Sequence, residues 1–139
     1  MAGVNAVLDT NVIVSAMLKQ NGREALIFDL AKAGRFTLVA SEALLGEYEE
    51  VLRRPEFGFD PGRLGSELAA IRRLAFLANP LMRVQASSDP DDDMVLECAL
   101  AGAADYVVTG NTRHFPSEFQ GIRIIPPRQF LVILAAELE

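Results

Sequence analysis

Carboxylates are the side chains in this sequence with the clearest potential for chemistry. Asp9 comes directly after the apolar residues 5–8, and residues 89–93 hold four aspartates in five positions. Carboxylate oxygens are the ligands that Mg²⁺ and Mn²⁺ take in proteins, with waters and substrate phosphates completing the shell. A cation held there can activate a water and stabilise charge on a cleaved phosphate without a protein nucleophile. The acids therefore indicate a divalent-metal site that cuts phosphodiester bonds.

Each acidic position also has a purely structural interpretation. Asp9 fits a helix N-cap or a turn residue, and acids at a helix start interact favourably with the helix dipole. Four carboxylates so close together exceed what capping needs, because like charges repel one another and a bound cation would relieve that repulsion. Glu47 lies at the border of an apolar helical stripe, where most glutamates are merely solvated. The residues alone leave both interpretations open.

Motifs for several other chemistries are missing from the sequence. His114 is the only histidine, which excludes a zinc site built from several histidines. The chain has no GK[ST] phosphate loop, HExxH pair, GxSxG elbow or CxxC pair, which disfavours nucleotide hydrolysis, zinc proteolysis and serine hydrolysis. The single cysteine, Cys98, cannot form an internal disulfide and falls in an apolar helical pattern. We therefore expect a buried, inert thiol and a reducing, cytoplasmic compartment.

Neither the start of the chain nor its hydropathy predicts a membrane protein. The first nine residues carry no basic segment, and no apolar run approaches the roughly 20 residues needed to span a bilayer. The net charge of −6 weighs against nucleic-acid binding. However, Asp9, Glu47 and the four aspartates of residues 89–93 make up six of the 19 acids, which leaves 13 acids against 13 basic residues. The excess negative charge can be the site itself.

The predicted order of elements places the acids at one edge of a sheet. A chain of 139 residues is long enough for one core and too short for two ordinary domains, so we expect a single domain, residues 1–139. Strands alternate with helices, which predicts an α/β fold with a mostly parallel sheet covered on both faces. In such sheets ligands bind beyond the carboxyl ends of the strands, where Asp9, Asn111 and Asp92–Asp93 are expected.

The individual elements follow from apolar patterns and from residues that cap or break helices. Ser41 is a plausible N-cap for a helix through residue 52, and an acidic turn at residues 87–93 leads into a helix that starts at Met94. Residues 55–61 read as a loop. Strands are predicted at residues 5–8, 36–40, 82–85, 106–109 and 122–125, and further helices from residue 12 and at 23–33, 62–77, 94–101 and 127–137.

Four segments in this order resemble the PIN domain family, in particular the VapC-like toxins of type II toxin–antitoxin systems. They are VLDTNVIVSA, SEALLGEYEEVL, DPDDDMVLECAL and ADYVVTGNTRHFP, and together they span nearly the whole chain. The resemblance implies a Rossmann-like three-layer α/β/α sandwich and a metal-dependent ribonuclease that uses Mg²⁺ or Mn²⁺. It also implies an RNA substrate, a cognate antitoxin that silences the enzyme, and a homodimer.

The resemblance assigns roles to individual residues. Asp9 matches the first aspartate of the family, Glu47 the helical glutamate, and Asp93 the aspartate that opens the later helix. Asp9 and Asp93 would bind metal directly, and Glu47 would bind it or orient the attacking water. Asp92 could substitute for Asp93 or bind through water. The polar residues that match those orienting the cluster are Thr10, Asn11 and Thr109.

The sequence departs from the family pattern at Asn111, where many PIN domains carry an aspartate. An asparagine keeps one oxygen but no charge, so a second metal would be held more weakly or only with substrate phosphate present. We therefore expect one firmly bound ion in the free protein. Arg113 and His114 follow the same strand, and either contact RNA phosphate or belong to a solvated loop.

Two other classes of protein compete with this interpretation. A haloacid-dehalogenase-like phosphatase also begins with a strand followed by Asp, but its second aspartate would be Asn11 here. The only lysines are Lys19 and Lys32, so no late lysine is available for that phosphatase or for a receiver-like phosphoacceptor domain. The non-enzymatic alternative is a catalytically weak PIN-fold module that binds RNA or protein, which the uncharged Asn111 favours.

Overall fold

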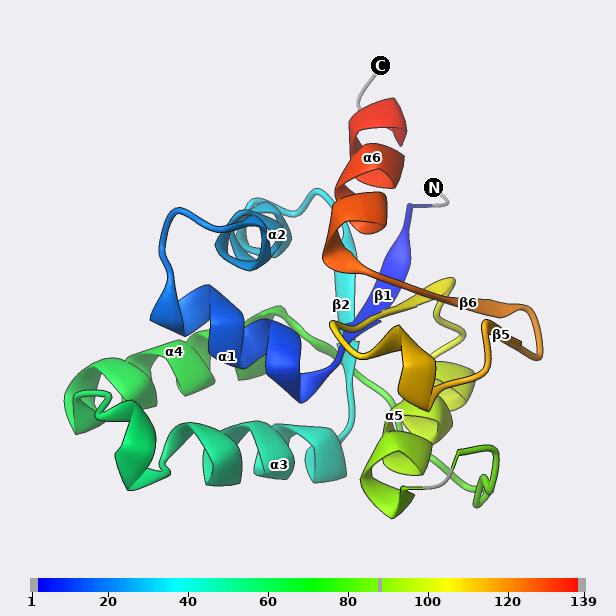
Figure 1. The fold of residues 1–139 in the computed structure, drawn as a ribbon, viewed down its shortest axis with the longest axis horizontal. Helices are drawn as coiled ribbons and strands as arrows, with labels where there is room; N and C mark the ends of the chain where they lie inside the picture. The colour runs from blue at the N-terminus through cyan, green and yellow to red at the C-terminus, as the bar shows by residue number, and fades with distance from the viewer. Residues whose placement is uncertain (1–2, 88, 138–139) are drawn as a thin grey trace.

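The computed structural model describes residues 3–87 and 89–137, and a parallel-rich sheet forms its centre (Figure 1). Within these residues six strands follow the order β3-β2-β1-β4-β6-β5. Neighbouring strands are parallel except for β5, which runs antiparallel to β6 at the edge. The strands are β1 Asn5–Leu8, β2 Thr37–Ala40, β3 Phe76–Leu77, β4 Tyr106–Val108, β5 Glu118–Phe119 and β6 Ile122–Ile125.

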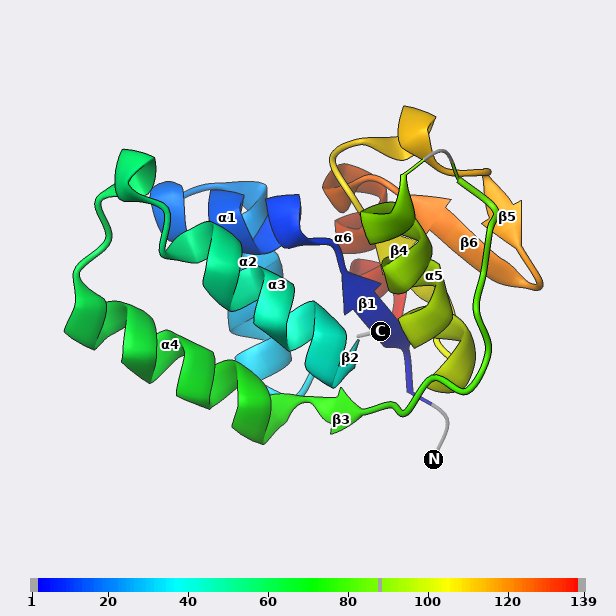
Figure 2. The ribbon, with the colours of Figure 1, turned by 90° about the horizontal axis from the view of Figure 1, so that it is seen from below.

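Helices cover the sheet on both sides. Helix α5 contacts β1, β2 and β4, and Figures 1 and 2 show α6 on the opposite side of these strands, where it packs with α2. The predicted α/β sandwich with a mostly parallel sheet is therefore confirmed. The helices are α1 Thr10–Leu18, α2 Arg23–Lys32, α3 Glu42–Leu52, α4 Pro61–Leu74, α5 Pro90–Ala101 and α6 Pro127–Glu137, with 3₁₀ turns at Pro55–Phe57 and Thr112–His114.

Local capping explains where several helices begin. Ser41 caps α3 as predicted, its hydroxyl accepting a hydrogen bond from the Leu44 N–H at 3.2 Å. Asp89 caps α5, and Pro90 occupies the first helical position, where a missing N–H costs nothing. At the other end of α5, Gly102 approaches β2 so closely that an added Cβ would lie 2.3 Å from Val39 Cγ1.

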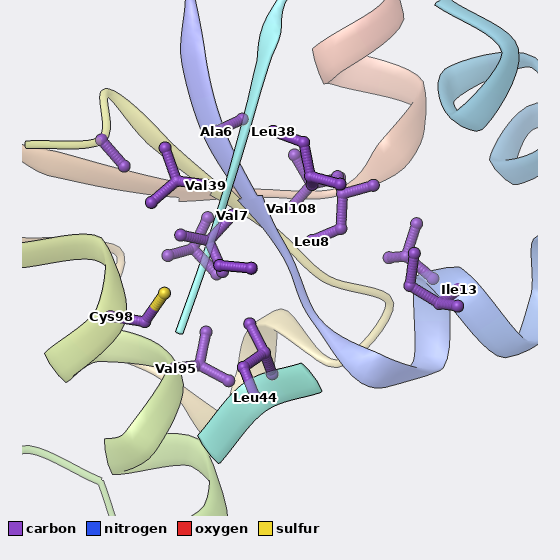
Figure 3. Packing of buried hydrophobic residues seen from close by; sticks show 14 of the residues in the cluster. Ala6, Val7, Leu8, Ile13, Leu38, Val39, Leu44, Val95, Cys98 and Val108 are labelled. Carbon is purple, nitrogen blue, oxygen red and sulfur yellow. The ribbon is translucent and has the colours of Figure 1, made fainter. Parts of the chain in front are cut away.

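The core lies between the sheet and the helices. Figure 3 shows side chains of β1 and β2 meeting Val95 and Cys98 of α5 on one side and Ile13 of α1 on another. Cys98 is fully buried, and burial raises its thiol pKa to about 11. This confirms the predicted buried thiol, which the raised pKa keeps protonated and unreactive. Among the described residues, no helix combines the length and apolarity needed to cross a bilayer.

Around residues 62–85 the predicted helix is present but ends early, and the predicted strand is wrong. The helix expected at 62–77 ends at Leu74, and Phe76–Leu77 instead pairs with β2 as an edge strand. Residues 82–85 form no strand, because β3 already occupies that edge of β2. Val84 is held there by its N–H, which donates to the Glu97 carboxylate at 2.8 Å.

The remaining differences concern short elements and one boundary. Helix α5 begins at Pro90 rather than Met94, so Asp91, Asp92 and Asp93 belong to its first turn. Part of the loop predicted at 55–61 is a 3₁₀ turn, and the edge strand β5 was not predicted. Ser88, which lies within the predicted acidic turn, falls outside the described residues.

Candidate active site

The candidate site lies where the strand order reverses. From β1 the chain moves outward through β2 and β3, and it then returns to the other side of β1 with β4. Leu8 pairs with Val108, so the carboxyl ends of these two neighbouring strands lie level. The Asp9 N–H continues the ladder and donates to the Val108 carbonyl at 2.9 Å. Such a reversal opens a crevice at the carboxyl edge of a parallel sheet, where ligands bind.

Asp9 is buried at this crevice and is surrounded by hydrogen-bond donors. Only 6% of the residue is exposed. Its carboxylate accepts from the Thr10 N–H at 2.8 Å, the Thr109 hydroxyl at 2.8 Å and the Asn11 amide at 3.1 Å. Burial raises the pKa of Asp9, and these donors, with Thr109 first, oppose the rise. Asp9 is also the N-cap of α1, which confirms its structural interpretation.

Asn11 and Thr109 join the turn after β1 to the turn after β4. The Asn11 amide donates to the Thr109 hydroxyl at 3.3 Å, and its oxygen accepts from the Gly110 N–H at 2.9 Å. Thr109 is fully buried and also accepts from the Asn111 N–H at 3.0 Å. The polar residues that the sequence grouped around Asp9 are thus brought together in a single network.

Glu47 reaches the same crevice from α3. Its carboxylate is half-buried and accepts a hydrogen bond from the Thr10 hydroxyl. Burial raises the pKa of Glu47, Thr10 opposes the rise, and the nearby carboxylates of Asp91, Asp9 and Asp92 raise it further. Glu47, which the resemblance assigned to the site, therefore lies beside the turn that carries Asp9.

Asp92 and Asp93 are neighbours in α5 but face different surroundings. The Asp93 carboxylate, of a residue 8% exposed, accepts from the N–H groups of Ala86 and Ser87 at 3.0 and 2.8 Å. Asp93 thus holds the loop that leads into α5. The Oδ2 atom of Asp92 is buried and has no hydrogen-bond partner among the described residues.

The charges around Asp92 show that it faces the acidic crevice. Burial raises the pKa of Asp92 to about 6, and the carboxylates of Asp9 and Asp89 add to the rise. His114 opposes it, because its Nδ1 lies 4.0 Å from Asp92 Oδ2. These electrostatic effects therefore group Asp92, rather than Asp93, with Asp9 and Glu47.

The residues that follow β4 lie at the exposed border of the candidate site. Asn111 is exposed, and its backbone N–H is what binds Thr109. Arg113 is also exposed, in the 3₁₀ turn at the mouth of the site. His114 is exposed, and its Nδ1 atom lies 4.0 Å from Asp92 Oδ2. The structure thus places the His114 side chain beside Asp92, which sequence reasoning did not anticipate.

The acidic cluster matches a hard divalent cation in its chemistry but is not closed around one. Within residues 3–87 and 89–137, no group of three His, Cys, Asp or Glu side chains is arranged to hold a metal ion as it stands. The donors of Asp9, Glu47 and Asp92 are nevertheless all oxygens, the ligands that Mg²⁺ and Mn²⁺ prefer. The buried Asp92 oxygen without a donor is a position that a cation would satisfy.

Comparison with known families identifies the class of protein. A family model described as PIN domain matches residues 5–113. The chain therefore belongs to the PIN domain family, whose members are generally nucleases and typically use divalent metals. No curated protein matches the chain. The match sets aside the phosphatase and receiver alternatives, and it gives the chain a nuclease-type fold.

Proposed function

We propose that this protein is a Mg²⁺- or Mn²⁺-dependent endoribonuclease, the toxin of a type II toxin–antitoxin pair. The observation that carries the nuclease proposal is the convergence of Asp9, Glu47 and Asp92 at the carboxyl edge of the sheet. All three have raised pKa values because burial penalises their charged forms, and nearby carboxylates add to the rise for Glu47 and Asp92. Family membership supports hydrolysis of a nucleic acid. RNA as substrate, a cognate antitoxin and a homodimer rest on the resemblance of the four sequence segments.

In this proposal Asp9, Glu47 and Asp92 hold the cation. When bound, the ion supplies activation of water and neutralises charge on the phosphate. Thr109, Thr10 and Asn11 keep the Asp9 carboxylate in place through hydrogen bonds. Glu47 is half-buried with a raised pKa, so it can orient the attacking water and accept its proton. Asn111 offers a neutral oxygen beside the site, so we expect one firmly bound ion without substrate.

The geometry changes one assignment made from the sequence. Asp93 accepts the backbone N–H groups of Ala86 and Ser87 with its Oδ1 atom, whereas the buried Oδ2 atom of Asp92 has no donor among the described residues. We therefore propose Asp92 as the direct ligand from α5 and Asp93 as the residue that holds the loop. Arg113 and His114 lie at the mouth of the site, where they can contact RNA phosphates.

The test is cleavage of a labelled, mixed-sequence RNA by antitoxin-free protein in Mg²⁺ or Mn²⁺. We expect cleavage that EDTA abolishes and that Asp9→Asn lowers by about 10²–10³-fold, because this change removes charge from the centre of the cluster. The matched control is Asp105→Asn. Asp105 lies just before β4, at the amino end of the strand, where its carboxylate accepts a hydrogen bond from the Asn5 N–H at 2.9 Å. This variant should cleave RNA normally. Cleavage that persists in EDTA would overturn the metal requirement.

A non-catalytic binding module is the alternative supported by specific observations. The acids do not enclose a metal as they stand, and Asn111 lacks the charge found at this position in many PIN domains. Under this alternative the protein binds Mn²⁺ and RNA but leaves the RNA intact. The same cleavage assay, combined with a binding measurement, separates the two functions.

A further inference from the structure

Two hydrogen bonds attach α3 to the turn that carries Asp9, one on each side of it. The Tyr48 hydroxyl donates to the carbonyl of Leu8. The Thr10 hydroxyl donates to the carboxylate of Glu47. Asp9 lies between the two anchored residues of the turn, and Glu47 and Tyr48 are adjacent in α3. The relative placement of Asp9 and Glu47 therefore depends on this pair of bonds.

The direction of the Leu8 carbonyl follows from the alternation of β1. The Asn5 carbonyl accepts from the Asp105 N–H at 2.8 Å, and the Asp9 N–H donates to Val108 at 2.9 Å, so both residues face β4. Successive residues of a strand turn their backbone groups to opposite sides. Leu8 therefore faces the β2 side.

The ladder on the β2 side has already ended at this level. Pairing between β1 and β2 stops at Ala6↔Leu38, and the chain leaves β2 after Ala40 and enters α3. The fully buried Leu8 residue would then have a carbonyl without a donor, which is costly in a core. The Tyr48 hydroxyl provides that donor from α3, in place of the missing strand partner.

Tyr48 has no access to the crevice itself. Its side chain is fully buried, and burial raises its pKa well above the usual value for tyrosine. This excludes a role in proton transfer to substrate and leaves a role that acts through other residues.

We propose that Tyr48 is a positioning residue that holds Glu47 and Asp9 at the separation needed to share one cation. The inference rests on the proposed metal-dependent function. It makes the relative position of the two carboxylates depend on a side chain that touches neither metal nor RNA. Without the hydroxyl, α3 remains packed against α1, α4 and α5, but Glu47 keeps only the Thr10 bond to the Asp9 turn.

The test compares Tyr48→Phe with Tyr106→Phe, a matched control on the second tyrosine of the chain. Tyr106 is half-buried on β4, and its hydroxyl has no hydrogen-bond partner among the described residues. Mn²⁺ affinity is measured by calorimetry well below the unfolding temperature of each variant. For Tyr48→Phe we expect the Kd for Mn²⁺ to rise about tenfold and kcat for RNA to fall about tenfold, as for other supporting residues of metal sites. KM should stay within about twofold, and Tyr106→Phe should match the wild type.

The outcomes separate this inference from the function on which it rests. A purely structural role would lower the unfolding temperature of Tyr48→Phe but leave its Mn²⁺ affinity unchanged, and this result would overturn the inference alone. If the wild type bound no Mn²⁺, the proposed function would fail. Amide hydrogen exchange of Asp9 and Thr10 in metal-free protein would then still test the attachment: faster exchange in Tyr48→Phe supports it, and unchanged exchange overturns it.

Discussion

The two sides of the acidic crevice are built differently. On the sheet side, the Asp9 carboxylate has three hydrogen-bond donors, from Thr10, Asn11 and Thr109. On the α5 side, the buried oxygen of Asp92 has none among the described residues. The Asp9 carboxylate is therefore held in place by the protein alone. The Asp92 carboxylate has a buried oxygen that a bound cation would stabilise.

This difference indicates how the site divides its tasks. Hydrogen bonds to a carboxylate stabilise its charged form and fix its orientation, whereas burial beside other acids destabilises that form. On the sheet side, Asp9 therefore provides a ligand of fixed orientation. On the α5 side, Asp92 provides affinity for a cation, because a bound cation stabilises the charged form that burial destabilises. Mutations on the two sides should accordingly differ in their effects on stability and on metal binding.

The largest expected contrast is between Asp92→Asn and its neighbour Asp93→Asn. Asp92→Asn should lower the rate of RNA cleavage about 10²–10³-fold and weaken Mn²⁺ binding, because it removes charge that the crevice presents to the cation. Asp93→Asn keeps an oxygen that accepts from the Ala86 and Ser87 N–H groups, so its rate should stay within about tenfold of the wild type.

The controls for this contrast are the unfolding free energies of both variants. Asp92→Asn should be at least as stable as the wild type, because it removes a crowded, desolvated charge. Asp93→Asn should be slightly less stable, because a charged acceptor is replaced by a neutral one. The reverse pattern, with cleavage lost in Asp93→Asn and retained in Asp92→Asn, would restore the assignment made from the sequence.

The distinction between these two aspartates shows where sequence reasoning stopped. With α5 taken to begin at Met94, the acids formed a turn in which no side chain had a defined direction. The Asp89–Pro90 pair is a helix-start signal. A helix beginning at Pro90 puts Asp92 on the same stripe as the fully buried Val95 and Ala99. That signal could have placed Asp92 on a helical stripe with buried residues rather than in a turn.

Elements defined by their own residues were predictable, and those defined by distant partners were not. Strand β1 and the start of α3 follow from a local apolar run and a serine cap, and both match the structure. The strand Phe76–Leu77 exists because the edge of β2 is open to it, and helical spacing through Leu74 gave no sign of that. The bond from Tyr48 to Leu8 spans 40 residues, and no local pattern reports such a contact.

A smaller effect is expected from Thr109→Val on the sheet side. Valine keeps the shape of the buried threonine but removes the hydroxyl that donates to Asp9 and accepts from the Asn111 N–H. Mn²⁺ affinity should fall about tenfold, and the free energy of unfolding should fall by about 1–2 kcal/mol. Thr37→Val, at an exposed position of β2, is the matched control. Unchanged affinity in Thr109→Val would mean that the donors around Asp9 serve the fold alone.

The smallest expected effect is a pH dependence that belongs to the α5 side. Because the pKa of Asp92 is about 6 in the folded protein against 3.8 as its ordinary value, the folded state binds this proton more tightly than the unfolded state. The contribution to stability is therefore fully present below about pH 4 and is lost as the pH rises through about 6. After allowance for solvent screening, we expect a loss of about 1 kcal/mol.

Urea unfolding of metal-free protein between pH 4 and 7 measures this loss. Asp9 and Glu47 also have raised pKa values and act in the same direction, so the comparison that isolates Asp92 is wild type against Asp92→Asn. The variant should lose less stability over this range, and saturating Mn²⁺ at pH 7 should stabilise the wild type more than the variant. If the free energy of unfolding of the two proteins changed with pH in parallel, burial would not destabilise the charged form of Asp92. The contrast between the two sides of the crevice would then disappear.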